Sequence, residues 1–133
     1  MTKKVFTNGC FDLLHRGHIE ILKYAKSLGD ELVVAIDSDQ RVKNLKGNSR
    51  PLYCLEDRIE ILSSIKYVDK VYSFSTDLEL EHIIKNVNPC FLVKGSDWKL
   101  DKIIGSQYVK EVVIFERVYG LSTTQTIQNI SHR

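Results

Sequence analysis

Apolar and polar positions follow two alternating patterns along this chain, and each pattern predicts one type of secondary structure. The segment Glu31 to Ile36 contains a continuous apolar run, which is typical of a parallel strand covered on both faces. Shorter strands are predicted at Lys4 to Thr7, Lys70 to Phe74, Phe91 to Val93 and Val112 to Phe115. The intervals between these strands carry a different periodicity.

Apolar residues recur at helical spacing in those intervals. Helices are predicted over residues 21–28, 55–65, 80–87 and 123–131. Thr76 and Glu79 have the spacing of a capping box before the third helix, and Asn88-Pro89 ends it. Alternating strands and helices predict an α/β fold: one Rossmann-like, doubly wound domain over residues 1–133, with a mainly parallel five-stranded sheet flanked by helices. Ligands of such sheets bind beyond the carboxyl ends of the strands.

Composition narrows the class of protein. The chain has 133 residues, 43% hydrophobic and 27% charged, which suits one globular domain. No apolar run approaches the roughly 20 residues that span a bilayer, and Met1 to Lys4 carries no leader pattern, so we expect a cytoplasmic protein without a membrane partner. A net charge of +2 is too small to predict a nucleic-acid partner. Cys10, Cys54 and Cys90 form no C-x-x-C pair and are expected to be reduced, half-buried thiols.

The strongest chemical signal follows the first strand, where Asn8-Gly9 leads to His15, Gly17 and His18 at an expected helix start. Free backbone N–H groups and the helix dipole favour phosphate there, and Gly17 permits close approach of a ligand. The histidines would donate hydrogen bonds to phosphate oxygens. Two alternatives remain: a metal site, for which the sequence offers no third ligand, and a helix cap beside a core histidine.

A second candidate anion site lies near the C-terminus, where Arg117 precedes Gly120 and the run Ser122-Thr123-Thr124. Arginine offers a fork of donors suited to phosphate, and the hydroxyl run is expected at another helix start. The alternative is a plain N-cap made by Ser122 or Thr123.

Two segments after strands are ambiguous. Lys46 and Arg50 are predicted on a loop after the second strand, either as mobile cations that reach substrate phosphate or as a solvated basic surface. Asp39 follows the same strand and would contact the acceptor or, with Ser38, cap the next helix.

Three further residues have equally open roles. Asp97 and Trp98 follow the fourth strand, where they would frame a base or sugar, although a tryptophan there would also fill a core. Arg58 is expected to face the site or a dimer partner.

Four segments of the chain resemble a known family or one of its subfamilies. Gly9 to His18 resembles the H-x-G-H signature of the cytidylyltransferase-like nucleotidylyltransferases, and Arg117 to Thr124 is similar to their second signature. Leu45 to Pro51 resembles the K-G-x-S-R-P stretch of the heptose 1-phosphate adenylyltransferases, which make ADP-heptose, and Leu92 to Trp98 resembles their L-V-K-G-x-D-[YW] stretch. The form of the second signature is nearer the glycerol-3-phosphate cytidylyltransferases.

The resemblance implies a nucleotidyltransferase that joins a nucleoside monophosphate from ATP or CTP to a sugar or polyol phosphate. It implies Mg²⁺ with the triphosphate, no protein-bound metal, a homodimer, and a separate kinase. The implied catalytic residues are His15, His18, Lys46 and Arg117. The implied nucleotide-binding residues are Gly9, Cys10, Phe11, Gly17, His18, Lys94, Gly95, Asp97, Ser122, Thr123 and Thr124. The implied substrate-binding residues are Asp12, Asp39, Lys46, Arg50, Arg58 and Trp98.

Two hypotheses of other functional classes remain beside the nucleotidyltransferase hypothesis. A nucleotide-binding module without catalysis would keep the pocket but not need every one of these groups. A metal-dependent hydrolase would need a third ligand beside the two histidines.

Overall fold

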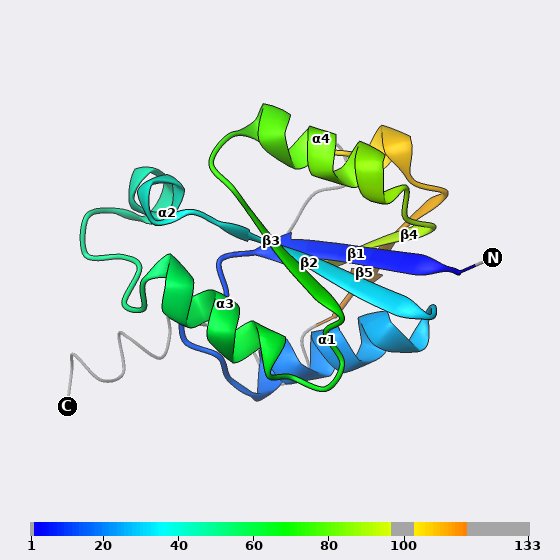
Figure 1. Ribbon diagram of the computed structural model, residues 1–133, viewed down its shortest axis with the longest axis horizontal. Coiled ribbons are helices and arrows are strands. Elements are labelled where there is room, and N and C mark those ends of the chain that lie inside the picture. Colours follow the sequence, from blue (N-terminus) through cyan, green and yellow to red (C-terminus); the bar gives the residue numbers. More distant parts are fainter. Residues whose placement is uncertain (1, 97–102, 117–133) are drawn as a thin grey trace.

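The computed structural model describes residues 2–96 and 103–116 and contains one parallel sheet (Figure 1). The strand order is β3-β2-β1-β4-β5, and every neighbouring pair is parallel. The strands are β1 Lys4–Gly9, β2 Glu31–Asp37, β3 Lys70–Phe74, β4 Phe91–Gly95 and β5 Glu111–Phe115. The predicted five-stranded, doubly wound α/β fold is therefore confirmed. The predicted closing helix lies outside the described residues.

Helices cover both faces of this sheet. Helices α1 (Arg16–Ser27) and α3 (Leu55–Ser63) lie on one face, and α4 (Asp77–Val87) lies on the other (Figure 1). A short 3-10 helix, η2 (Ser106–Tyr108), precedes β5. No helix within the described residues is long and apolar enough to cross a membrane.

The apolar run of β2 explains this layering. Leu32, Val34 and Ile36 point into the core under α1 and α3, whereas Val33 and Ala35 point into the core under α4. Because both faces of the strand are buried, both sets of side chains are apolar, as the continuous run predicted. The predicted capping box of α4 is also present, since Thr76 accepts from the Glu79 amide.

One element was missed. The segment predicted as a loop contains α2 (Asp39–Lys46), so Lys46 ends a helix instead of lying on a loop. Ser38 caps α2 by accepting a hydrogen bond from the Arg41 amide at 3.3 Å. The helix buries only Val42, so it lacks the apolar periodicity that marks the other helices. A loop does follow, beginning at Gly47 with φ of 102°.

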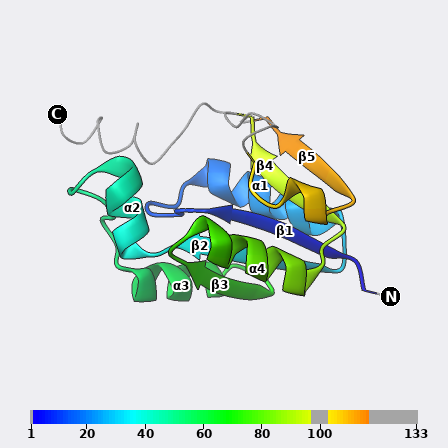
Figure 2. The same ribbon diagram turned by 90° about the horizontal axis from the view of Figure 1, so that it is seen from above.

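The sheet has its switch point at β1, which pairs with β2 on one side and β4 on the other. The carboxyl ends of these strands, at Gly9, Asp37 and Gly95, meet at one edge of the sheet. Helix α2 lies beyond this edge in both views (Figure 1, Figure 2). This carboxyl edge is where a doubly wound sheet binds its ligand.

Candidate active site

The turn after β1 is shaped by an aromatic residue in an unusual backbone conformation. Phe11 has φ of 48°, and its ring is buried and packs against the His18 ring with centroids 5.4 Å apart. A Cβ at Gly9 would lie 3.2 Å from the Phe11 ring, so glycine gives the ring its space. The sequence predicted Phe11 and Gly9 as nucleotide contacts; in the structure Phe11 packs against His18, and Gly9 leaves room for the Phe11 ring.

The two histidines form a cap at the start of α1. His15 Nδ1 accepts from the Gly17 amide at 3.0 Å, and His18 Nδ1 accepts from the His15 amide at 3.2 Å. Their ring centroids lie 4.1 Å apart. Since Nδ1 is the acceptor in both neutral rings, we assign the ring proton to Nε2 in both. The predicted helix cap is therefore present and uses Nδ1 of each ring, so that a phosphate-donor role would fall to Nε2–H.

Asp12 connects this turn to the segment before α3. One carboxylate oxygen accepts from Arg50 Nε at 3.1 Å and the Leu52 amide at 2.7 Å, and the other accepts from the Tyr53 amide at 2.9 Å. Both side chains of the Asp12–Arg50 pair are buried. Both expectations for Arg50, a mobile cation that reaches substrate phosphate and a solvated basic surface, are therefore wrong in this structure, because the carboxylate of Asp12 holds its guanidinium inside the protein.

Arg58 is fully buried and binds three parts of the chain: the segment before α3, the turn after β1, and the junction of β2 with α2. Its Nε donates to the Tyr53 carbonyl at 3.0 Å, and its Nη1 donates to the carbonyls of Cys10 and Asp37 at 2.9 and 2.8 Å. Its Nη2 donates to Asp39 Oδ1 at 2.7 Å. The sequence predicted Arg58 and Asp39 as substrate contacts, whereas in this structure they bind each other. Arg58 therefore faces the carboxyl edge, one of the two positions expected for it, and its donors bind protein groups there.

Cys10 and Asp37 form a polar contact that the sequence analysis missed. Cys10 Sγ donates to Asp37 Oδ2 at 3.4 Å. Burial and the negative charge of Asp37 raise the pKa of the Cys10 thiol to about 11, although the positive charges of Lys46 and Arg58 act to lower it. Cys10 is therefore a neutral thiol near pH 7. The charge of Lys46 contributes to the electrostatic environment of this thiol, at the turn after β1. The sequence did contain a signal for Asp37, because an acidic residue directly follows the apolar run of β2.

Lys94 lies beneath the switch point. It is buried at the end of β4, and its Nζ donates to the Asn8 carbonyl at 2.9 Å. Thr7 Oγ1 donates to the Val93 carbonyl at 2.7 Å, so two side chains tie β1 to β4. The sequence predicted Lys94 and Gly95 as nucleotide contacts, and the structure places both at the carboxyl edge.

The predicted residues thus fall into two groups. The structure brings these to the carboxyl edge: Gly9, Cys10, Phe11, Asp12, His15, Gly17, His18, Asp39, Lys46, Arg50, Arg58, Lys94 and Gly95. These lie outside the described residues: Asp97, Trp98, Arg117, Ser122, Thr123 and Thr124. Within residues 2–96 and 103–116, no group of three His, Cys, Asp or Glu side chains is placed to hold a metal ion.

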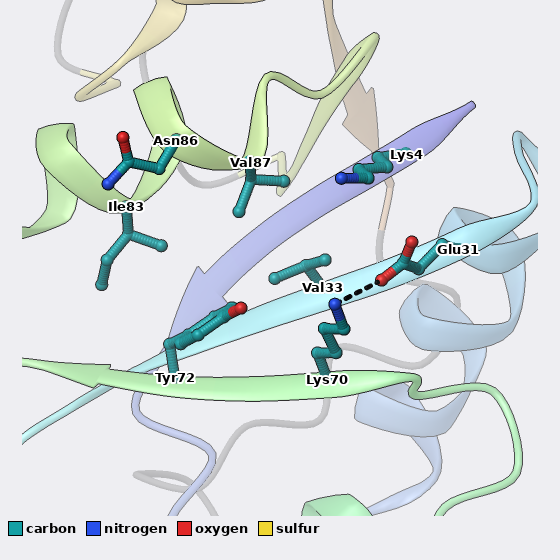
Figure 3. Close-up of a pocket in the computed structure, with 8 residues that line it drawn as sticks. All are labelled: Lys4, Glu31, Val33, Lys70, Tyr72, Ile83, Asn86 and Val87. Atoms are coloured by element: carbon teal, nitrogen blue, oxygen red, sulfur yellow. Dashed lines mark ion pairs between the residues drawn. The ribbon is translucent and has the colours of Figure 1, made fainter. Parts of the chain in front are cut away.

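A cavity of about 220 Å³ lies at the opposite edge of the sheet, by the amino ends of β1, β2 and β3 (Figure 3). Val33 and Val87 are among its apolar lining residues, and Lys4 and the Lys70–Glu31 ion pair add charge. No residue that the sequence predicted for the site lines this cavity. Among the described residues, those that the sequence predicted for the site thus lie at the carboxyl edge and not around this cavity.

Two curated proteins are similar to almost the whole of this chain. The bifunctional protein HldE of Campylobacter fetus subsp. fetus (strain 82-40) is 48% identical over 126 residues, 95% of this chain and 27% of that protein. The bifunctional protein HldE of Helicobacter pylori (strain HPAG1) is 46% identical over 128 residues, 96% of this chain and 27% of that protein. The chain thus spans about a quarter of the length of these curated relatives.

Solved structures give the same fold. The lipopolysaccharide core biosynthesis protein from Thermoplasma volcanium GSS1 is 29% identical with a TM-score of 0.74, covering 88% of this chain and 98% of that one. Pantoate-beta-alanine ligase from Francisella tularensis, at 18% identity and a TM-score of 0.63 over 96% of this chain and 65% of that one, shows a likeness of fold alone. The family model described as cytidylyltransferase-like matches residues 6–131, and the chain belongs to this cytidylyltransferase-like family.

Proposed function

We propose that this chain is a nucleotidylyltransferase that transfers a nucleoside monophosphate from a nucleoside triphosphate to a sugar phosphate, with release of pyrophosphate. The observation that carries the proposal is the capped histidine pair, His15 and His18, at the start of α1 on the carboxyl edge. Two Nε2–H donors beside a helix N-terminus suit the charge that develops on a phosphate under attack.

The proposed substrates are ATP and D-glycero-D-manno-heptose 1-phosphate, giving ADP-heptose. Membership of the cytidylyltransferase-like family supports the reaction class. Similarity to the HldE proteins supports an HldE-like adenylyltransferase domain, as does the resemblance of Leu45 to Pro51 to the heptose enzymes.

The reaction is an in-line displacement at the α-phosphorus. An acceptor phosphate oxygen, already ionised near pH 7, forms the new P–O bond, and the bond from the α-phosphorus to the bridging oxygen breaks. Pyrophosphate leaves with that electron pair, so the step needs neither a general base nor a covalent intermediate. Catalysis then depends on positioning and charge stabilisation.

Each group has a proposed task in this step. His15 and His18 stabilise the α-phosphate, and Lys46 attracts the acceptor phosphate. Arg117 and the run Ser122 to Thr124 hold the β- and γ-phosphates, and Asp97 with Trp98 frames the base or sugar. The triphosphate enters as its magnesium complex, since Mg²⁺ is commonly bound through substrate phosphates. We also propose a homodimer, which multi-angle light scattering after size exclusion would test.

The deciding experiment measures pyrophosphate release with Mg²⁺, pairing ATP and CTP with the heptose 1-phosphate and with glycerol 3-phosphate. Release with ATP and the heptose phosphate alone supports the proposal. Release with CTP and glycerol phosphate alone would favour a glycerol-3-phosphate cytidylyltransferase, as the form of Arg117 to Thr124 suggests. Nucleotide binding without release in any of the four pairs would favour a non-catalytic module.

A further inference from the structure

The turn after β1 has two sides with different partners. On one side, Phe11 packs against His18. On the other, Asp12 binds Arg50 and the amides of the residues that lead into α3. We propose that Asp12 is a positioning residue that couples the histidine turn to the segment between α2 and α3, and thereby fixes the acceptor side of the site. Its kinetic consequence rests on the proposed function; the coupling itself does not.

Both carboxylate oxygens of Asp12 accept hydrogen bonds from protein groups in this connection. Its side chain has no exposed surface, and it accepts three hydrogen bonds, one from a buried guanidinium. Hydrogen bonds to a charged acceptor are about twice as strong as neutral ones. An amide in place of the carboxylate would turn an NH₂ group toward at least one of these donors, so Asp12→Asn weakens the connection with almost no change of volume.

Hydrogen bonds fix both ends of the segment that Asp12 holds. The Arg50 amide donates to the Gly47 carbonyl at 3.2 Å, and the Gly47 amide donates to the Lys43 carbonyl at 2.9 Å. At the other end, the Tyr53 carbonyl accepts from Arg58 Nε. The ion pair between Asp12 and Arg50 therefore fixes the turn from Gly47 to Arg50, which directly follows Lys46.

Lys46 ends α2 and directly precedes the segment that Asp12 holds. Its positive charge acts on the Cys10 thiol, which lies at the start of that turn. Asp12 thus holds this segment against the turn and fixes the residues that directly follow Lys46. Loss of the Asp12 connection would move the cation that receives the acceptor phosphate, and small misplacements of binding groups have large kinetic effects.

Hydrogen–deuterium exchange of the free protein tests the coupling without any substrate. We expect Arg50→Gln and Asp12→Asn to speed amide exchange in two peptides, residues 47–53 and residues 13–18. Lys43→Gln, which removes an exposed cation from α2, is the matched control and should change neither. Faster exchange confined to residues 47–53 in Arg50→Gln would overturn the proposal, because the perturbation would not have reached the histidines.

Steady-state kinetics tests the acceptor assignment. We expect Arg50→Gln to raise KM for the acceptor by about tenfold or more while KM for the triphosphate stays within about twofold. A merely structural role would lower the folded fraction and leave both KM values unchanged, and an equal rise in both would contradict the assignment. If the unaltered chain releases no pyrophosphate with any substrate pair, the proposed function fails, and the exchange experiment alone decides the coupling.

Discussion

The two edges of the sheet differ in how deeply their charged side chains are buried. At the carboxyl edge, the side chains of Asp12 and Arg58 have no exposed surface, and each makes several hydrogen bonds to protein groups. At the amino edge, Lys70 and Glu31 pair at 3.5 Å with the Lys70 side chain 57% exposed. A buried charge is tolerated only where it is paired and hydrogen-bonded, so the carboxyl edge must be rigidly organised.

This difference shows why a cavity alone does not locate the site. The amino edge has a cavity of about 220 Å³, but the Lys70–Glu31 ion pair beside it reaches the surface and is weakened by water, since the Lys70 side chain is exposed. The carboxyl edge has buried ion pairs that fix loops in place, which is what a site depending on positioning requires.

The largest expected effect is on the free energy of unfolding, which should fall far more for a substitution at the carboxyl edge than for one at the amino edge. Arg58→Met should lower the free energy of unfolding by about 3–5 kcal/mol, because four acceptors lose a buried partner. Lys70→Met at the amino edge should cost about 0–1 kcal/mol. Urea unfolding of both variants with matched m-values measures the difference. Similar losses for the two variants would contradict the contrast between the edges.

The second prediction concerns activity. His18→Ala should lower the rate of pyrophosphate release by on the order of 10²–10³, as expected for loss of one transition-state donor. His82→Ala, on the exposed surface of α4, should leave the rate unchanged. A fall of less than about threefold in His18→Ala, with the protein folded by circular dichroism, would remove His18 from the catalytic step.

The contrast between edges also explains what the sequence could predict. The strands and α1, α3 and α4 were predictable because their apolar residues recur with a clear period. Helix α2 was not, since it buries only Val42. The candidate site was located by the histidine motif, but Arg50 and Arg58 were assigned to substrate because sequence gives no sign of partners 38 and 48 residues away, at Asp12 and Cys10.

The third prediction uses thiol reactivity to test burial at the carboxyl edge. With a pKa of about 11, the Cys10 thiol is almost entirely protonated at pH 8, whereas Cys54 is exposed. Iodoacetamide at pH 8 should modify Cys54 at least about tenfold faster than Cys10, as followed by peptide mass spectrometry. Asp37→Asn should lower the Cys10 pKa and speed its alkylation, because the Asp37 charge helps to raise that pKa. Equal rates at both cysteines in the unaltered protein would refute the buried contact.

The smallest effect is expected at the amino edge, where Asp69 accepts from Lys26 Nζ at 2.6 Å and the Leu32 amide at 2.7 Å. Burial acts to raise the pKa of Asp69, but these hydrogen bonds outweigh it and lower the pKa below its ordinary value. A carboxyl group with a lowered native pKa stabilises the fold fully above its unfolded pKa of about 3.9, and this contribution is lost as pH falls through the native pKa.

Asp69→Asn should therefore reduce the free energy of unfolding at pH 7 by less than about 1 kcal/mol, since the Asp69 side chain is 38% exposed and water screens its charge. Urea unfolding at a series of pH values should show this difference shrinking below about pH 4. Glu111→Gln, which alters an exposed carboxylate at the start of β5, is the control and should show no such pH dependence. A loss of several kcal/mol at Asp69, independent of pH, would mean that the amino edge depends on buried charge as strongly as the carboxyl edge does.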